Sequence, residues 1–171
     1  YVGMRNATIR DSMTRLIRDS LNTLSFIARQ NKAFYAQIVA AEFECELRLL
    51  CWDTDNIVRS KLCNFLGNLC KHSDECYPML ARQMSEVERG EEYKEGSEDE
   101  DCRVNDAKSV RGRTLIAHLA TRLRDEDPAT RKFAAFAVGN AAFHSDALYS
   151  DLRVTIPALV DALRYDKTHK T

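Results

Sequence analysis

Cysteine and histidine are the residue types in this chain that could bind a metal ion or act as nucleophile and base. No two cysteines have the CxxC spacing, and the histidines do not complete a zinc-binding pattern. Cys63 and Cys70 fall on one apolar helical stripe, where a free thiol behaves as a small hydrophobic group. We therefore expect no metal site, and reduced cysteines in a reducing compartment. The residues concerned are Cys45, Cys51, Cys63, Cys70, Cys76, Cys102, His72, His118, His144 and His169.

The sequence lacks the short motifs that mark hydrolases, nucleotide-binding enzymes and protein kinases. It has no HExxH, GxSxG or Walker loop, and no GxGxxG, HRD, DFG or APE. His72 and His144 could act as bases, but they recur at the same place of an internal repeat, which is typical of structural residues. We expect a non-catalytic chain without a cofactor.

The strongest pattern is a match of the chain with itself. Residues 59–77 align with residues 131–149 without a gap, and both segments carry G-N-x3-H-S-D-x2-Y. A weaker upstream copy aligns Tyr35 with Tyr77, 42 residues apart, whereas Tyr77 and Tyr149 are 72 apart. The extra 30 residues are close to the length of one acidic stretch, so the underlying period is about 42, as in armadillo and HEAT repeats. The repeat-motif residues are Gly67, His72, Tyr77, Gly139, His144 and Tyr149.

Within each repeat the apolar residues have the period of α-helices. Five apolar residues between Val58 and Leu69 fall on one helical face, and Asp55 and Asp127 are suited to cap helices that follow them. A second helix over residues 115–123 recurs over 156–163, and a short helix over 146–152 joins them. Three helices per unit predict an all-α, right-handed superhelical solenoid of armadillo type (ARM/HEAT-like).

This register divides the chain into five parts. They are a degenerate repeat (1–42), a repeat (43–85), an acidic disordered insert (86–110), a repeat (111–154) and the start of a truncated repeat (155–171). The chain opens on Tyr1 and stops within a repeat, so we expect a fragment of a longer protein. No apolar run approaches the roughly 18 residues of a membrane span.

Two glycines of the repeat lie inside predicted helices. A glycine there costs about 1 kcal/mol relative to alanine. Because Gly67 and Gly139 recur in register, we expect both to allow the close approach of a neighbouring helix.

The third helices of successive repeats are predicted to line a partner-binding groove. Asn68 and Asn140 have two open interpretations: they hold neighbouring repeats together, or they grip a partner's backbone. Phe136 is either an exposed anchor in this groove or part of the core between repeats. The predicted groove residues are Arg59, Asn64, Asn68, Arg131, Lys132, Phe136 and Asn140.

Two segments point to a family. Residues 58–73 (VRSKLCNFLGNLCKHS) and 127–149 (DPATRKFAAFAVGNAAFHSDALY) resemble the C-terminal armadillo region of Fused-family serine/threonine kinases. The resemblance continues through residues 152–160 and covers roughly 43–84 and 111–171, whereas the first 40 residues and the acidic stretch depart from it.

The resemblance implies a partner-binding scaffold whose parent carries a kinase domain elsewhere. It also implies kinesin-like or microtubule-associated partners in the cytoplasm, at the cytoskeleton or in the cilium, and roles in Hedgehog-type signalling or cytokinesis. The alternative is a free-standing armadillo adaptor or an importin-like peptide-binding protein. Importin grooves pair a tryptophan with an asparagine four residues later, but Trp52, the one tryptophan here, is not at such a place.

Charge is distributed unevenly along the chain. Residues 86–106 hold ten acidic and three basic residues, a net charge of −7, so the rest of the chain carries +6. Such an acidic block is predicted to be disordered, and Ser97, which is followed directly by acidic residues, is a candidate phosphorylation site. The basic residues are scattered and lack an aromatic platform, so an acidic peptide or acidic polymer surface is expected as partner rather than nucleic acid or membrane.

We predict that deleting residues 89–106 leaves the thermal stability of the chain unchanged, because a block of this composition buries little apolar surface. Thermal melts of the full chain and the deletion variant, followed by circular dichroism, measure this. A midpoint lowered by several degrees would show that the segment packs on the folded body.

Overall fold

The computed structural model describes residues 2–83 and 114–165, and within these ranges every regular element is a helix. This confirms the predicted all-α class. The predicted acidic insert (86–110), including Ser97 and Cys102, lies outside the described residues, as does His169. In the described part no helix is long and apolar enough to cross a membrane.

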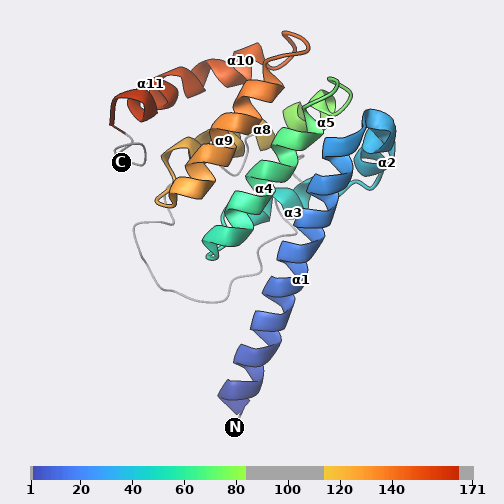
Figure 1. The fold of residues 1–171 in the computed structure, drawn as a ribbon, viewed down its shortest axis with the longest axis vertical. Coiled ribbons are helices and arrows are strands. Elements are labelled where there is room, and N and C mark those ends of the chain that lie inside the picture. The colour runs from blue at the N-terminus through green and yellow to red at the C-terminus, as the bar shows by residue number, and fades with distance from the viewer. Residues whose placement is uncertain (1, 84–113, 166–171) are drawn as a thin grey trace.

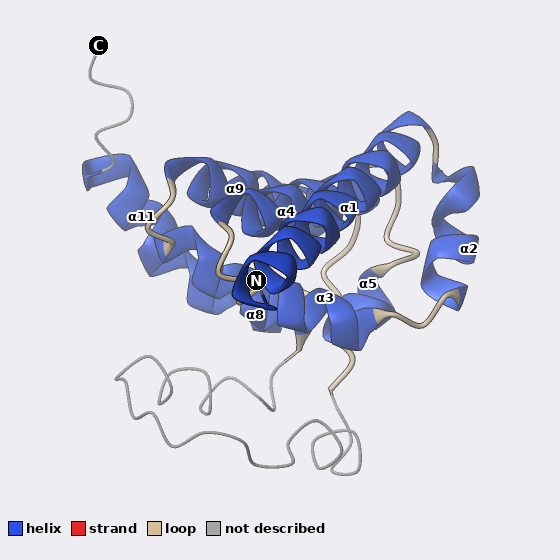
Figure 2. Cartoon of the chain, turned by 90° about the horizontal axis from the view of Figure 1, so that it is seen from below, coloured by secondary structure: helices blue, strands red, loops and turns tan. Residues whose placement is uncertain are grey.

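Three long helices lie side by side, with the middle one in contact with both others (Figure 1). They are α1 (Val2–Gln30), α4 (Asn56–Leu69) and α9 (Pro128–Ala141). Figure 2 shows the shorter helices gathered on one side of this layer. The molecule therefore has a layer of long helices and a layer of short ones.

The same order of elements follows each long helix. A short helix begins at a repeat tyrosine, and a second helix comes after it: α2 (Tyr35–Ala40) and α3 (Glu44–Leu50) follow α1; α5 (Tyr77–Ala81) and α8 (Leu115–Thr121) follow α4; α10 (Tyr149–Leu152) and α11 (Ile156–Tyr165) follow α9. Short 3-10 helices adjoin them at Lys32–Phe34, Arg122–Arg124 and Arg153–Thr155.

The predicted helix starts are confirmed. The carboxylate of Asp55 accepts hydrogen bonds from the amides of Ile57 and Val58, and that of Asp127 accepts one from the amide of Thr130. These bonds satisfy amides in the first turn that have no intrahelical acceptor. The two long helices that carry the G-N-x3-H-S-D-x2-Y motif thus begin in the same way.

The predicted apolar stripe of α4 forms the centre of the core. Its members are fully buried, and the corresponding positions of α9 hold the small residues on which α4 packs. The stripe residues of α4 are Val58, Leu62, Phe65, Leu66 and Leu69, and the corresponding buried apolar residues of α9 are Ala134, Ala137, Val138 and Ala141.

Four of the cysteines belong to this core. Cys51, Cys63, Cys70 and Cys76 are buried and form no disulfide, and Cys45 is half-buried. Burial raises the pKa of the Cys51 thiol to about 12, so this thiol remains protonated and unreactive at neutral pH.

The two repeat glycines differ, which corrects the prediction that both lie at tight helix contacts. A Cβ on Gly67 would lie 2.5 Å from the ring of Phe136 and 3.1 Å from the Cα of Ala137. The close approach of α9 to α4 therefore requires a glycine at position 67. A Cβ on Gly139 would have no neighbour within 4 Å. The reason is that α9 covers α4 on this side, whereas no described helix covers the corresponding side of α9.

We predict opposite effects for the same substitution at these two sites. Both Gly→Ala changes gain helix propensity of up to about 1 kcal/mol. Gly139→Ala should therefore raise the free energy of unfolding, whereas Gly67→Ala should lower it by about 1–2 kcal/mol because the methyl group displaces Phe136. Urea unfolding of both variants tests this, and equal effects at the two sites would contradict the packing described here.

Candidate partner-binding face and the contacts beneath it

The segment before each of α4 and α9 is built around an aspartate–arginine pair. Nη1 of Arg59 donates to the carbonyl oxygens of Asp53 and Thr54, at 2.9 and 3.3 Å. In the same register, Nη1 of Arg131 donates to the carbonyl oxygens of Asp125 and Glu126, both at 3.0 Å. The two arginines of the predicted groove therefore hold the turns that lead into their own helices.

Arg59 also reaches the next repeat. Its Nε and Nη2 donate to the two carboxylate oxygens of Asp125, at 2.9 and 2.8 Å, and Arg122 donates to the same carboxylate at 2.9 Å. The side chains of Arg59 and Asp125 are almost fully buried. Burial alone raises the pKa of Asp125, but hydrogen bonds from Arg59 and the Asp127 amide, with the charges of both arginines, outweigh it and lower that pKa.

Asparagines of the repeat join neighbouring long helices. Nδ2 of Asn68 donates to the hydroxyl of Ser25 on α1 at 2.8 Å, and Nδ2 of Asn140 donates to the carbonyl of Gly67 on α4 at 2.8 Å. Ser25 and Gly67 are themselves 42 residues apart, so both asparagines bind the same place of the preceding repeat. This geometry supports the interpretation that they hold repeats together.

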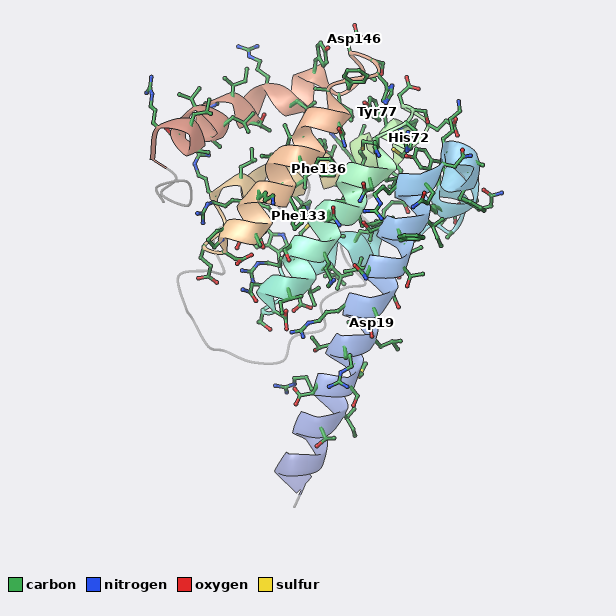
Figure 3. All side chains as sticks on the ribbon, in the orientation of Figure 1. Asp19, His72, Tyr77, Phe133, Phe136 and Asp146 are labelled. Carbon is green, nitrogen blue, oxygen red and sulfur yellow. The ribbon has the colours of Figure 1, made fainter. Side chains whose placement is uncertain are left out.

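Tyrosine and histidine complete the connection (Figure 3 labels Tyr77 and His72). The Tyr35 hydroxyl donates to the carbonyl of Asn68 at 2.7 Å, and the Tyr77 hydroxyl donates to that of Asn140 at 3.0 Å. Nε2 of His72 lies 2.8 Å from the carbonyl of Arg29, and Nε2 of His144 lies 3.0 Å from that of Lys71. A carbonyl only accepts, so Nε2 carries the proton in both histidines.

The outer surface of α1, α4 and α9 remains accessible above these contacts, and we call it the long-helix face. Residues seven apart lie on the same side of a helix. The long-helix face is made by Arg15, Asn22 and Arg29 from α1, by Ile57, Asn64 and Lys71 from α4 and its C-terminal end, and by Ala129, Lys132, Phe136 and Phe143 from α9 and its C-terminal end. All are exposed except Asn64, which is half-buried. Four of these residues are basic and none is acidic.

The predicted groove residues thus fall into two groups. Arg59 and Asn68 are buried, and Arg131 and Asn140 are half-buried with bonds inside the molecule. Asn64, Lys132 and Phe136 belong to the long-helix face, where the Phe136 ring lies over Gly67 and keeps an exposed edge.

Several contacts have no counterpart in the sequence predictions. Nε1 of Trp52 donates to Nδ1 of His118 at 2.9 Å, and the guanidinium of Arg122 lies 4.2 Å from the Trp52 ring, so this tryptophan binds within the short-helix layer. Asp125 was also missed, although the spacing Asp53-x-Asp55 and Asp125-x-Asp127 recurs 72 residues apart and could have revealed it.

The described residues contain no group of three His, Cys, Asp or Glu side chains placed to hold a metal ion. An open cavity of about 470 Å³ lies between α1 and residues 53–55. Its arginines and aspartates balance each other, and Arg18 and Asp55 form an ion pair there.

Comparison with known proteins gives a distant relationship. No protein-family model matches the chain, and no solved structure matches it. The chain is 27% identical over 154 residues to the mouse (Mus musculus) serine/threonine-protein kinase 36. This match covers 86% of the chain and 10% of the kinase. The chain is thus a helical region distantly homologous to a small part of a much longer Fused homologue.

We predict that Asp125→Asn lowers the free energy of unfolding by roughly 3 kcal/mol, because Arg59 is left with an uncompensated buried charge. Glu126→Gln is the control: this exposed residue lies 3.4 Å from the same arginine and should cost less than about 1 kcal/mol.

The effect should also depend on pH. Because the pKa of Asp125 is lowered by folding, its contribution is present above the unfolded value of about 3.9 and is lost as the pH falls through the folded value. Urea unfolding between pH 7 and 3 should show a smaller difference between the wild type and Asp125→Asn at the acidic end. A constant difference would show that the carboxylate charge is not what matters.

Proposed function

We propose that this chain is an armadillo-type helical-repeat segment that acts as a non-catalytic protein-interaction scaffold. The observation that carries the proposal is the repeated set of hydrogen bonds between long helices. Tyr35 and Tyr77 make the same bond one repeat apart, as do His72 and His144. Asn68 and Asn140 donate to the same place of the preceding repeat, at the hydroxyl of Ser25 and the carbonyl of Gly67. A chain that repeats its inter-helix contacts in this way grows by stacking units, which is the principle of a solenoid.

The armadillo type is supported by the elements within a unit. Each described unit has a long helix, a short helix that begins at a tyrosine, and a second helix, with an underlying period of about 42 residues. Stacked units of this kind form a right-handed superhelix whose successive long helices make one continuous binding surface.

The likeness to mouse serine/threonine-protein kinase 36 supports a parent related to Fused-like kinases. Since this chain has no kinase motif and matches a tenth of that relative, the proposed kinase domain belongs to another part of the parent. The corresponding setting is the cytoplasm, at the cytoskeleton or in the cilium, with kinesin-like or microtubule-associated partners.

The proposed partner-binding site is the long-helix face. Arg15, Arg29, Lys71 and Lys132 give it positive charge, and the rings of Phe136 and Phe143 give it exposed apolar surface. Exposed aromatic residues flanked by basic ones suit an extended acidic segment of a partner protein. The buried groove residues Arg59 and Asn68 would hold this face in shape from below.

A capture experiment with a charge-matched control tests this site. We predict that Lys71→Glu/Lys132→Glu loses partners captured from lysates of ciliated or dividing cells at low salt, because it reverses two charges on the long-helix face. The control, Arg153→Glu/Arg164→Glu, reverses two exposed charges near α11 and should keep these partners. Circular dichroism melts establish that both variants are folded, and quantitative mass spectrometry compares what they retain.

Equal retention of the same proteins by the wild type and both variants would show that the long-helix face is not the binding site. Equal loss in both variants would show that total charge, and not this face, determines capture.

A further inference from the structure

The side of α9 that faces away from α4 carries the same kinds of groups that α4 uses to bind α9. We call this surface the α9 edge and define it by Gly139, the carbonyl of Phe143 and the hydroxyl of Tyr149. These positions correspond to Gly67, Lys71 and Tyr77, 72 residues earlier. At these earlier positions Gly67 lies under the ring of Phe136, and its carbonyl accepts a hydrogen bond from the side-chain amide of Asn140. The carbonyl of Lys71 accepts one from the ring of His144, and the hydroxyl of Tyr77 donates to the carbonyl of Asn140.

At the α9 edge the residues Gly139, Phe143 and Tyr149 are all exposed. The side chain of Tyr149 is 54% exposed, whereas Tyr35 and Tyr77 are 0% and 2% exposed because a neighbouring long helix covers them. The Tyr149 hydroxyl donates to the carbonyl of Ala142 in its own repeat at 3.3 Å, just as Tyr35 donates to Ala28 at 3.2 Å. Tyr35 shares its one hydroxyl hydrogen between this carbonyl and that of Asn68 on the next long helix, at 2.7 Å, whereas no described helix offers Tyr149 such a second acceptor.

We propose that the α9 edge is a docking surface for the long helix of one further repeat unit. The chemistry of the edge specifies that helix. It carries an asparagine, whose amide reaches the Gly139 carbonyl and whose own carbonyl accepts from Tyr149. It carries a histidine four residues later, whose ring donates to the carbonyl of Phe143. This inference rests on the repeat architecture and not on partner binding to the long-helix face.

The edge also selects the residue four positions before that asparagine. The polar side chain of Asn64 donates a hydrogen bond to Ser25, whereas the ring of Phe136 packs over Gly67. Because Gly139 again presents a surface without a side chain, the incoming helix carries an aromatic residue at this position. The pattern is therefore aromatic-x3-Asn-x3-His.

A second copy of this chain does not fit the edge. Its free long helix is α1, which has Asn22, Phe26 and Gln30 where the aromatic, asparagine and histidine are needed. Phe26 has no amide for the Gly139 carbonyl, and Gln30 has no imidazole. The α9 helix of a second copy has the right residues, but α4 already occupies that side of it.

The test extends the chain by a copy of its own unit. Residues 159–164 repeat the register of residues 119–124, so residues 1–164 followed directly by a second copy of residues 125–165 continue the repeat without a break. The added copy supplies Phe136, Asn140 and His144 and carries Tyr149→Phe, so that the original Tyr149 can be followed alone. Nitration by tetranitromethane, read by mass spectrometry, reports whether Tyr149 is accessible.

We expect Tyr149 to be nitrated readily in the parent chain and at least about tenfold more slowly in the extended chain, with a rise in Tm of roughly 5 °C or more. Two controls separate specific docking from loose association. Asn140→Ala/His144→Ala in the added copy, or Gly139→Leu in the original unit, should restore rapid nitration. The Gly139→Leu change has no described neighbour to disturb in the parent chain.

Rapid nitration of Tyr149 in the extended chain overturns the proposal, and so does protection that survives both controls. An added unit that stays unfolded by circular dichroism, beside an unchanged melt of the original part, overturns it as well. Protection of Tyr149 in the parent chain that grows with protein concentration would assign the edge to a second copy. None of these outcomes alters partner capture by the long-helix face, so the two proposals can fail separately.

Discussion

The structure depends on satisfying the carbonyl groups at the ends of its long helices. The last carbonyls of a helix lack the regular donor four residues later, and here side chains of a neighbouring unit donate to them. Tyr35 and Tyr77 donate to Asn68 and Asn140 near the ends of α4 and α9, and His72 donates to Arg29 at the end of α1. The carbonyls of Asn68 and Asn140 also accept the backbone amides of Lys71 and Phe143, so each tyrosine adds a second donor, worth about 0.5–1.5 kcal/mol net. These side chains thereby align each long helix with its neighbouring unit.

A second constraint acts at the opposite ends of the same helices. Arg59 binds Asp125 through two hydrogen bonds in a nearly dry site, and Arg122 shares that carboxylate. Such a buried pair adds little net stability, because desolvation offsets much of the attraction, but a shifted register would leave charges unpaired. The polar contacts therefore select one alignment of α4 and α9, and the apolar surface between Phe65, Leu66 and the alanines of α9 provides most of the stability.

The sequence predicted those features that depend on residues within one unit. Helix starts at Asp55 and Asp127, the buried stripe of α4 and the common register of Tyr35, Tyr77 and Tyr149 all follow from local pattern. Features that depend on a neighbour were less accessible. Gly139 has the same place in the repeat motif as Gly67 but lacks the neighbouring helix that makes Gly67 necessary, and the burial of Asp125 follows only from the approach of Arg59. The predicted groove residues are divided for this reason: Lys132 and Phe136 are exposed, whereas Arg59 and Asn68 are buried beneath the surface, and the sequence alone left both interpretations of Phe136 open.

The positions that are bonded inside the molecule and those that are exposed also differ in how they vary from one unit to the next. The positions that recur, such as Gly67 with Gly139 and His72 with His144, are those that connect one unit to the next or would do so. The long-helix face is built from positions that differ between units: Asn22, Asn64 and Phe136 share one place of the repeat, and Arg29, Lys71 and Phe143 share another. A contact that every unit makes alike cannot tell one partner from another, so discrimination has to come from the positions that vary. The repeated residues thus set the spacing of the units, and the varying residues would determine what the proposed partner meets at each step along the long-helix face.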